Sequence, residues 1–239
     1  MPSSSARGRR PRGGPGPHGR PLPRSFYDRD PLLVARAVLG RLLVHDGPGG
    51  RASGRIVEAE AYRGATDPAS HACRGPTPRN AAMFGAPGHA YVYFTYGMHH
   101  CLNLVTQPRG RASAVLVRAV EPVEGIPLMR RRRGVGETAR LGRGPGNVAR
   151  ALGLTRAHDG LDLTRGPLWL SDLPPRRGGR RIARSGRVGI RVDRERPWRC
   201  YLEGHPCVSA PRGARPGSVR SRKRPRPGRS RVDTAVTSF

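Results

Sequence analysis

The stretch from Arg55 to Tyr62, RIVEAEAY, alternates with a period of two and predicts a β-strand. Successive side chains of a strand point to opposite faces of the sheet. One face of this strand is small and apolar and is expected to pack on the core, whereas the other carries two carboxylates and ends in an aromatic ring. The first face holds Val57, Ala59 and Ala61, and the second holds Ile56, Glu58, Glu60 and Tyr62.

Other apolar runs predict the elements around this strand. Asp30 followed by Pro31 is typical of a helix start, and Gly40 is expected to end that helix. A strand-rich middle with helices at its margins favours an α+β fold with antiparallel or mixed pairing. Further helices are predicted over residues 121–133 and 148–152, short extended pieces over 161–163 and 168–170, and strands over 42–44, 90–95, 101–106, 114–120, 187–192 and 199–202.

The two ends of the chain differ in composition from the middle. Residues 1–24 are mostly Pro, Gly, Ser and Arg, and residues 212–239 are basic and polar, so both are expected to be disordered arms. A chain of 239 residues can bury one good core, which places a single domain at residues 25–211. Within it, residues 64–88 are rich in proline and glycine and predict a long loop, which is more often functional than idle.

The charge of the chain is extreme, because 45 Lys+Arg against 16 Asp+Glu give a formal net charge of +29. A coding bias explains why nearly all basic residues are arginine, but it does not explain their excess over acidic residues. The excess predicts attraction to a polyanion, with nucleic acid favoured over a membrane because no long apolar run or amphipathic basic helix is present. No apolar segment follows the basic N-terminus, so a cytoplasmic, nucleoid-associated protein is expected.

Glu60 is the first candidate for catalysis, because a carboxylate in a core strand is costly to bury unless it is paired or used. It could be a general base, an acid, a metal ligand or half of an ion pair, and a single strand carboxylate is most often half of an ion pair. Glu58 on the same face could raise the pKa of Glu60 or pair with an arginine, and the pair is favoured. Arg118 shares a strand face with Leu116 and Val120 and must find an anion or several carbonyls.

Metal and cofactor chemistry find little support in the spacing of the residues. The clusters at His71 and His99 lack the paired ligand spacing of zinc sites, and the four cysteines are expected to be reduced thiols. The signatures of zinc base deaminases, P-loops and dinucleotide-binding folds are missing, so no metal and no cofactor are expected. Lys223 is the only lysine and falls in the C-terminal arm, which disfavours an amine-dependent lyase.

Four ordered motifs carry a resemblance to a known family. GRIVEAEAY, the His71 loop with TPRN, YVYFTYGMHHCLN and VLVRAVEP resemble the monofunctional alkyladenine (3-methyladenine) DNA glycosylases, and the match runs from about Phe26 to about Pro211. The resemblance implies a single mixed α/β domain with a curved antiparallel β core and peripheral helices. It also implies a monomeric enzyme without a cofactor that acts on double-stranded DNA containing damaged purines.

The resemblance assigns a role to each matching position. It implies that Glu60 is the general base that activates water, with Arg118 beside that water. Tyr62 and the His71 loop would sandwich the flipped base, with Tyr93 at the pocket edge. The remaining roles fall on Asn103, which would exclude the 2-amino group of guanine, on Tyr96 as the wedge in the minor groove, and on Met98, His99 and Arg79 as DNA contacts.

Two other classes of protein compete with this interpretation. A basic nucleic-acid-binding protein without enzymatic activity explains the charge and the arms, but it gives no use to Glu60 beside Tyr62. A hydrolase or transferase of small nucleosides would act without duplex DNA. Among alkylated and deaminated purines, the sequence leaves 3-methyladenine, 7-methylguanine, hypoxanthine and ethenoadenine open as substrates.

Overall fold

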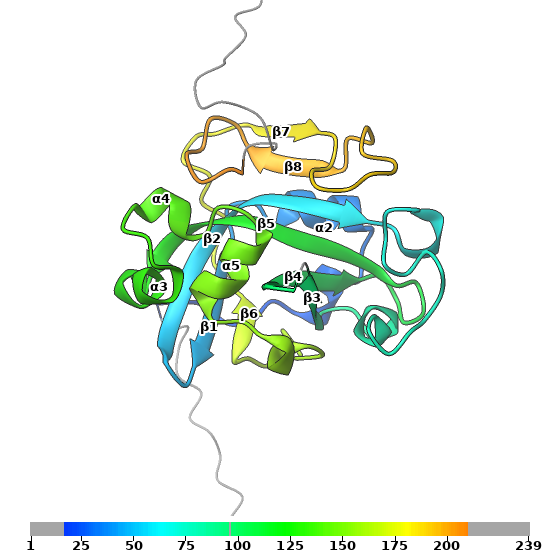
Figure 1. Cartoon of the computed structure of the whole chain (residues 1–239), viewed down its shortest axis with the longest axis horizontal. Helices are drawn as coiled ribbons and strands as arrows, with labels where there is room; N and C mark the ends of the chain where they lie inside the picture. The colour runs from blue at the N-terminus through cyan, green and yellow to red at the C-terminus, as the bar shows by residue number, and fades with distance from the viewer. Residues whose placement is uncertain (1–16, 96, 210–239) are drawn as a thin grey trace, which may run out of the picture. The chain divides into compact units, whose positions relative to one another are not determined.

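The chain folds around one antiparallel β-sheet of eight strands, seen in Figure 1 of the computed structural model, which describes residues 17–95 and 97–209. The strands are β1 (Leu42–Gly47), β2 (Gly50–Tyr62), β3 (Ala90–Thr95), β4 (His99–Thr106), β5 (Ser113–Glu124), β6 (Leu168–Leu170), β7 (Ile182–Ser185) and β8 (Arg199–Leu202). Six of them follow the order β3-β4-β5-β2-β1-β6. In addition, β8 pairs with β2 and β7 pairs with β8.

β2 is the central strand, because its 13 residues offer partners on both edges. β1 pairs with its first half and β8 with its second half, while β5 pairs along the other edge. A bulge at Val57 interrupts the pairing with β5, since Ile56 faces Val120 and Glu58 faces Ala119. The strict alternation predicted for this strand is therefore wrong at Val57, and Ile56 joins the main hydrophobic core.

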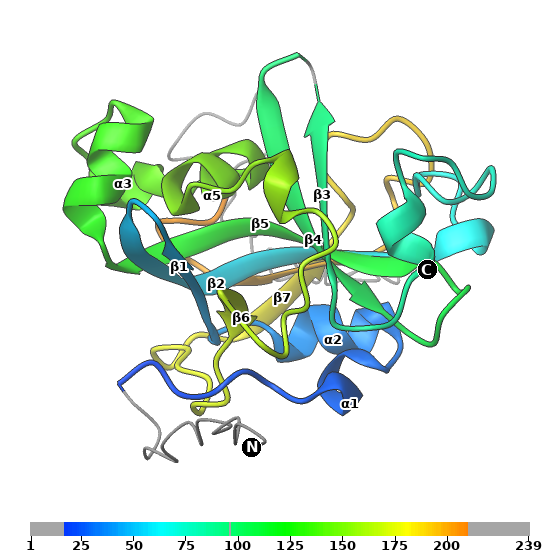
Figure 2. The same ribbon diagram turned by 90° about the horizontal axis from the view of Figure 1, so that it is seen from below.

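Helices cover both sides of the central strands. α2 packs against β2 and β5 from one side, and α5 packs against β4 and β5 from the other (Figure 2). α2 begins as predicted, since the Asp30 side chain accepts from the Leu32 N–H at 2.8 Å. The helices are α1 (Arg24–Tyr27), α2 (Pro31–Ala37), α3 (Ile126–Arg133), α4 (Thr138–Leu141) and α5 (Pro145–Leu152), with the 3₁₀ turns η1 (Gly64–Thr66), η2 (Ala81–Phe84) and η3 (Arg156–His158).

Two further local predictions are wrong. Residues 121–124 continue β5 instead of starting a helix, because they pair with β2, and α3 begins only at Ile126. Residues 187–192 form no strand, because the Arg187 N–H donates to the Arg194 carbonyl at 2.7 Å and folds the segment back on itself. The folded segment contacts β2, because the Val188 N–H donates to Glu60.

Part of the predicted N-terminal arm contacts the domain. The Arg20 N–H donates to Asp172 at 2.8 Å, and the buried Leu22 donates its N–H to the Leu170 carbonyl at 2.9 Å. The ordered structure therefore begins before residue 25, because Leu22 supplies an apolar anchor within the low-complexity stretch. Residues 1–16 and the predicted C-terminal arm lie outside the described residues.

The predicted fold class is confirmed. The described residues form a single mixed α/β domain with a curved antiparallel core and a few peripheral helices (Figures 1 and 2). Over the same part of the chain, no helix combines the length and apolar character that crossing a bilayer requires.

Candidate active site

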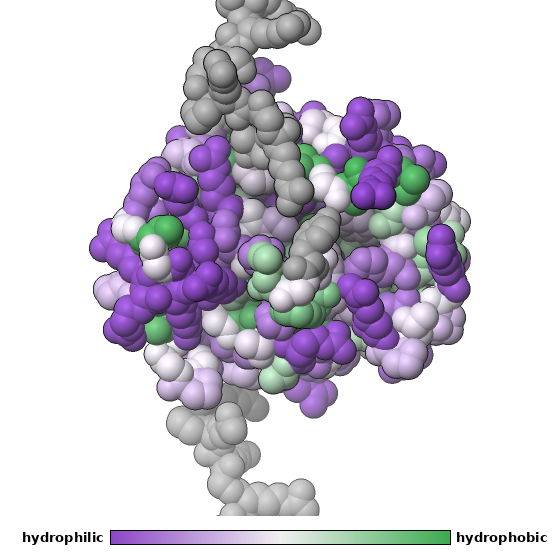
Figure 3. All heavy atoms as spheres, viewed as in Figure 1, coloured by the Kyte–Doolittle hydropathy of each residue, from purple (hydrophilic) through white to green (hydrophobic). Residues whose placement is uncertain are grey.

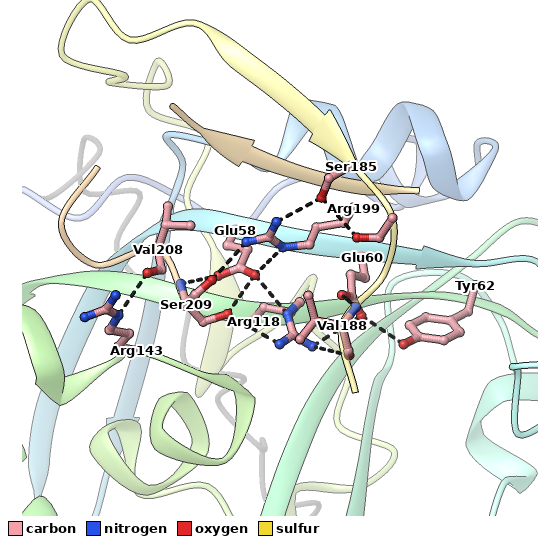
Figure 4. Close-up of polar contacts among 11 residues, drawn as sticks. Glu58, Glu60, Tyr62, Arg118, Arg143, Ser185, Val188, Arg199, Val208 and Ser209 are labelled. Carbon is pink, nitrogen blue, oxygen red and sulfur yellow. Dashed lines mark hydrogen bonds and ion pairs between the residues drawn. The ribbon is translucent and has the colours of Figure 1, made fainter. Parts of the chain in front are cut away.

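Glu60 lies in the second half of β2 with 0% of its surface exposed, and three donors surround its carboxylate (Figure 4). The Val188 N–H donates to Oε1 at 2.7 Å, and the Tyr62 hydroxyl donates to Oε2 at 2.9 Å. Arg118 Nη1 donates to Oε2 at 3.3 Å. These donors come from β2, from β5 and from the segment between β7 and β8, so the tertiary structure assembles them.

Glu58 holds Arg118 in place. Arg118 Nε donates to Glu58 Oε1 at 2.9 Å, which makes Glu58 a closer partner than Glu60. Arg199 of β8 donates to the same oxygen at 2.6 Å. The Ser209 N–H and hydroxyl complete the contacts at 2.7 and 2.8 Å (Figure 4). The ion pair predicted for Glu58 is confirmed, and of the two kinds of partner predicted for Arg118, an anion or several carbonyls, the structure shows the anion.

Arg118 occupies an irregularity in the pairing of β5 with β2. Glu58 faces Ala119, but the next residue, Ala59, faces Val117, so Arg118 is an extra residue on its strand. A bulge of this kind re-aims a side chain next to a functional site. Its guanidinium consequently reaches the two carboxylates of β2.

The burial of Glu60 changes its proton affinity. Burial raises the pKa of Glu60, and the Arg118 charge, the Val188 N–H and the Tyr62 hydroxyl offset only part of that rise. Burial would lower the pKa of Arg118, but Glu60 and Glu58 raise it, so the guanidinium stays charged. Burial and then the Glu60 charge raise the pKa of Tyr62 well above its ordinary value, so the phenol stays protonated. A carboxylate with a raised pKa beside a fixed cation is suited to accept a proton.

A small apolar cluster adjoins the carboxylate. Tyr62 and Tyr93 both belong to it, one at the end of β2 and the other on β3. Because Tyr62 also donates to Glu60, its ring lies in the cluster while its hydroxyl contacts the carboxylate. The other members are the buried Cys101 and Leu116 and the partly buried Ala69 and Ile190.

His71 extends the aromatic group. Its ring lies edge-on to Tyr93, with 4.5 Å between the centroids, and its Nδ1 is 2.9 Å from the Tyr91 hydroxyl. Tyr91 and Tyr93 stack at 5.4 Å. Asn80 holds the loop, since its Nδ2 donates to the His71 carbonyl at 2.8 Å. Burial and then the Arg79 charge lower the pKa of His71, so its imidazole is neutral at pH 7.

The β3–β4 hairpin carries four of the predicted site residues besides Tyr93. Asn103 is buried, and its Nδ2 donates to the Tyr91 carbonyl at 3.2 Å, beside the aromatic group. At the hairpin tip, Met98 is 69% exposed, and His99 lies against Gly146 of α5. Tyr96 falls in the gap between the described ranges 17–95 and 97–209.

Arg79 lies apart from Glu60, at the outer edge of β3. Its Nη2 donates to the Phe94 carbonyl at 3.0 Å, and its guanidinium is 5.9 Å from the centre of the Tyr93 ring. Together with Phe94, His100 and Arg156, it lines a hollow of about 400 Å³. Glu60 is not among the residues that line this hollow, and its carboxylate is enclosed by its own donors.

One surface of the domain is rich in arginine. Hydrophilic side chains gather over α3 and α4 on the face shown in Figure 3, where α3 contributes residues 130–133, all arginines. Such a surface provides sequence-independent attraction to phosphates. Within residues 17–95 and 97–209, no group of three or more His, Cys, Asp or Glu side chains is placed to hold a metal ion.

Sequence reasoning missed several residues that touch the site. Val188 was assigned to a strand, yet it supplies an N–H to Glu60. Arg199 and Ser209 contact Glu58, although they follow it by 141 and 151 residues in the sequence. Charge balance could have pointed to a second arginine such as Arg199. Two buried carboxylates on one strand face, Glu58 and Glu60, need more than the single cation of Arg118.

Comparison with known proteins gives consistent matches. The family model described as methylpurine-DNA glycosylase matches residues 25–206. A protein of Anaeromyxobacter dehalogenans strain 2CP-1 is 48% identical over 194 residues, which cover 80% of this chain and 86% of that protein. Proteins of Streptomyces avermitilis and Methanoculleus marisnigri are 47% and 49% identical and cover 84% and 79% of this chain and 96% and 98% of their own lengths. All three bear the name "Putative 3-methyladenine DNA glycosylase".

Proposed function

This chain belongs to the methylpurine-DNA glycosylase family, and we propose that it flips an alkylated or deaminated purine out of duplex DNA and hydrolyses its N-glycosidic bond with an activated water. Membership makes the protein a DNA glycosylase, a hydrolase of DNA repair whose substrate is DNA. The proposal adds the base flipping, the water mechanism, a monomeric enzyme and the absence of strand cleavage.

The enclosed carboxylate of Glu60 carries this proposal. A carboxylate within hydrogen-bond reach of a water molecule can accept a proton from it, which makes the water a better nucleophile toward the sugar C1′. Arg118 and the Val188 N–H fix the carboxylate from two sides and keep its orientation. Because Glu60 has no exposed surface, water and sugar reach it only when a covering group moves. Of the three donors, the Tyr62 hydroxyl at 2.9 Å is the neutral side chain, and its proton can turn from Glu60 toward a water molecule while the ring stays in place.

The aromatic group supports recognition of the base. Tyr62 and the His71 loop are proposed to sandwich the flipped purine, with Tyr93 at the edge. Aromatic faces attract an alkylated purine because it is cationic, and a neutral His71 adds no opposing charge. Asn103 is proposed to clash with the 2-amino group of guanine, and its fixed contact with the Tyr91 carbonyl supports a rigid pocket floor.

The hairpin tip and the basic surface support binding to DNA. Exposed Met98, together with His99 and Arg79, is proposed to contact the duplex on either side of the wedge Tyr96, which lies outside the described residues. Extruding a base costs a few kcal/mol of stacking, and an inserted side chain offsets part of that loss. The arginine-rich surface supplies the remaining affinity, which falls as salt concentration rises.

Duplexes that each contain one defined lesion are expected to break only after hot alkali. A water nucleophile leaves an intact abasic backbone, whereas an amine nucleophile would cut it through a Schiff base. The measurement incubates purified protein with labelled duplexes containing 7-methylguanine, 3-methyladenine, hypoxanthine or ethenoadenine and compares gels with and without alkali. Breaks without alkali would contradict the hydrolytic mechanism, and no breaks with any lesion would contradict the proposed substrate class.

The rate of base release is expected to rise with pH through the pKa of Glu60. Glu60 acts as a general base only when it is ionised, and burial raises its pKa. The pH at which the rate is half-maximal should therefore lie above 4.5, the ordinary pKa of a glutamate side chain. The measurement is a single-turnover pH profile on 7-methylguanine, whose permanent charge removes the need to protonate the leaving group. A flat profile from acidic to neutral pH would contradict general-base catalysis.

A further inference from the structure

Arg187 is a buried arginine that the proposed chemistry does not use. Its Nη1 and Nη2 donate to Asp67 Oδ2 and Oδ1 at 2.6 and 2.8 Å, and neither side chain has exposed surface. Nη1 also donates to the Ala61 carbonyl at 3.2 Å. Two parallel hydrogen bonds fix the plane of a guanidinium as well as its position. Removing two charges from water costs free energy that offsets much of their mutual attraction. A buried ion pair is therefore weak evidence of a purely stabilising role.

The guanidinium of Arg187 supports an aromatic wall of the site. It lies over the Tyr62 ring at 4.8 Å and over the Trp198 ring at 4.9 Å. A cation over a ring within about 6 Å is attracted to its face. Tyr62 is thereby held through its ring by Arg187 and through its hydroxyl by Glu60.

The backbone that follows Arg187 reaches the carboxylate directly. The next residue, Val188, donates its N–H to Glu60 at 2.7 Å, and its carbonyl accepts from Arg118 Nη1 at 3.1 Å. The Arg187 N–H is itself fixed on the Arg194 carbonyl at 2.7 Å. A shift of the Arg187 side chain would therefore move an amide that orients Glu60.

Asp67 ties the same arginine to the loop that leads to His71. Its Oδ2 accepts from the Arg63 N–H and its Oδ1 from the Ala69 N–H, both at 3.1 Å. These bonds fix the first turn of the loop. The Asp67–Arg187 pair thus joins the start of the loop, the Tyr62 ring and the amide at Glu60.

We propose that Asp67 and Arg187 are positioning residues that form a clamp, which holds the Tyr62 wall, the His71 loop and the Val188 amide in one arrangement around Glu60. The inference rests on the proposed function, because it takes Glu60 as the base. The clamp makes this side of the site the fixed one. Entry of the base then displaces the partly buried Tyr93, which belongs to the same cluster as Tyr62 but is not held by the clamp.

Arg187→Met is expected to slow single-turnover release of 7-methylguanine by about 10- to 100-fold, because small misplacements of reacting groups cost rates of this order. Affinity for a duplex containing an uncleavable abasic analogue should stay within about twofold, since Arg187 touches no DNA contact. Arg196→Met is the matched control. Its guanidinium lies over the same Trp198 ring at 4.7 Å, but it pairs with Asp193 and should leave the rate unchanged.

The pH profile separates positioning from a general loss of stability. Loss of the Val188 N–H bond should move the acid limb of the Arg187→Met profile to higher pH, because that bond favours the charged form of Glu60. Arg187→Lys keeps the charge but cannot form the two-pronged contact, so it should show the same shift and the same slow rate. The charged or titratable groups that face Glu60 are Glu58 and Tyr62 of β2, Arg118 of β5, Tyr93 of β3 and Arg187 itself.

A double variant distinguishes a loss of positioning from a loss of folding stability. Asp67→Asn with Arg187→Met removes both buried charges, so it should melt closer to the wild type than Arg187→Met alone while its rate stays low. Full activity in the double variant or in Arg187→Lys would overturn the clamp, as would equal losses in the Arg187 and Arg196 variants. Failure of the proposed function differs, because the wild-type protein would then release no base in the same assay.

Discussion

Replacing Glu60 with glutamine is expected to lower base release by about 10²–10⁴-fold or more, because an amide of the same shape cannot accept a proton from water. DNA affinity should stay within about twofold, since the buried side chain adds no exposed surface to the protein and glutamine has the same shape. Single-turnover release and equilibrium binding on the same 7-methylguanine duplex measure the two quantities separately.

Glu137→Gln provides the control for this variant. Glu137 is a carboxylate beside α4 whose side chain is 64% exposed and whose partner is Arg140 at 3.9 Å. Its replacement removes one negative charge from the protein without touching the site, so the rate should not change. Base release that persists in Glu60→Gln at the wild-type rate would show that Glu60 is a structural carboxylate only.

Replacing Arg118 with methionine is expected to lower the free energy of unfolding by about 3–5 kcal/mol, because removing one partner of a buried ion pair leaves uncompensated charge. Among the described residues, Glu60 would lose its only arginine contact, and Glu58 would keep Arg199 as its one remaining arginine partner. Urea denaturation followed by fluorescence or circular dichroism measures the change. Base release should fall as well, because the carboxylate would lose one of its fixed partners.

Two companion variants test the cause of that loss. Arg140→Met removes a 63% exposed arginine and should change the free energy of unfolding by less than about 1 kcal/mol. Adding Glu58→Gln to Arg118→Met removes one of the two buried carboxylates and should recover part of the stability. A single Arg118→Met variant as stable as the wild type would show that the network contributes nothing to folding.

The proposed clamp would let the enclosed carboxylate of Glu60 serve in catalysis. Two of its donors are held by further contacts: the buried Arg118 pairs with Glu58, and the half-buried Val188 accepts from Arg118 through its carbonyl. Its third donor is the hydroxyl of Tyr62, whose ring is held by Arg187. Turning the hydroxyl proton away from Glu60 costs less than breaking an ion pair and leaves the ring in place, so this is the donor that Glu60 exchanges most easily for water.

Local pattern was sufficient for much of the fold. The alternation of residues 55–62 identified the central strand and the shared face of Glu58 and Glu60, because period two follows from strand geometry. The Asp30-Pro31 pair located the start of α2, because its capping contact lies within three residues. The lone Arg118 on an apolar strand implied a partner, either an anion or several carbonyls, and the structure supplies two carboxylates.

Tertiary structure alone decided which groups meet around that strand. The bulges at Val57 and Arg118 depend on register between strands, which hydrophobic period does not encode. Arg199 and Ser209 reach Glu58 only because β8 pairs with β2 after more than half the chain has intervened. Val188 reaches Glu60 through its backbone N–H, a group that every residue but proline carries, so no side-chain pattern could have marked it.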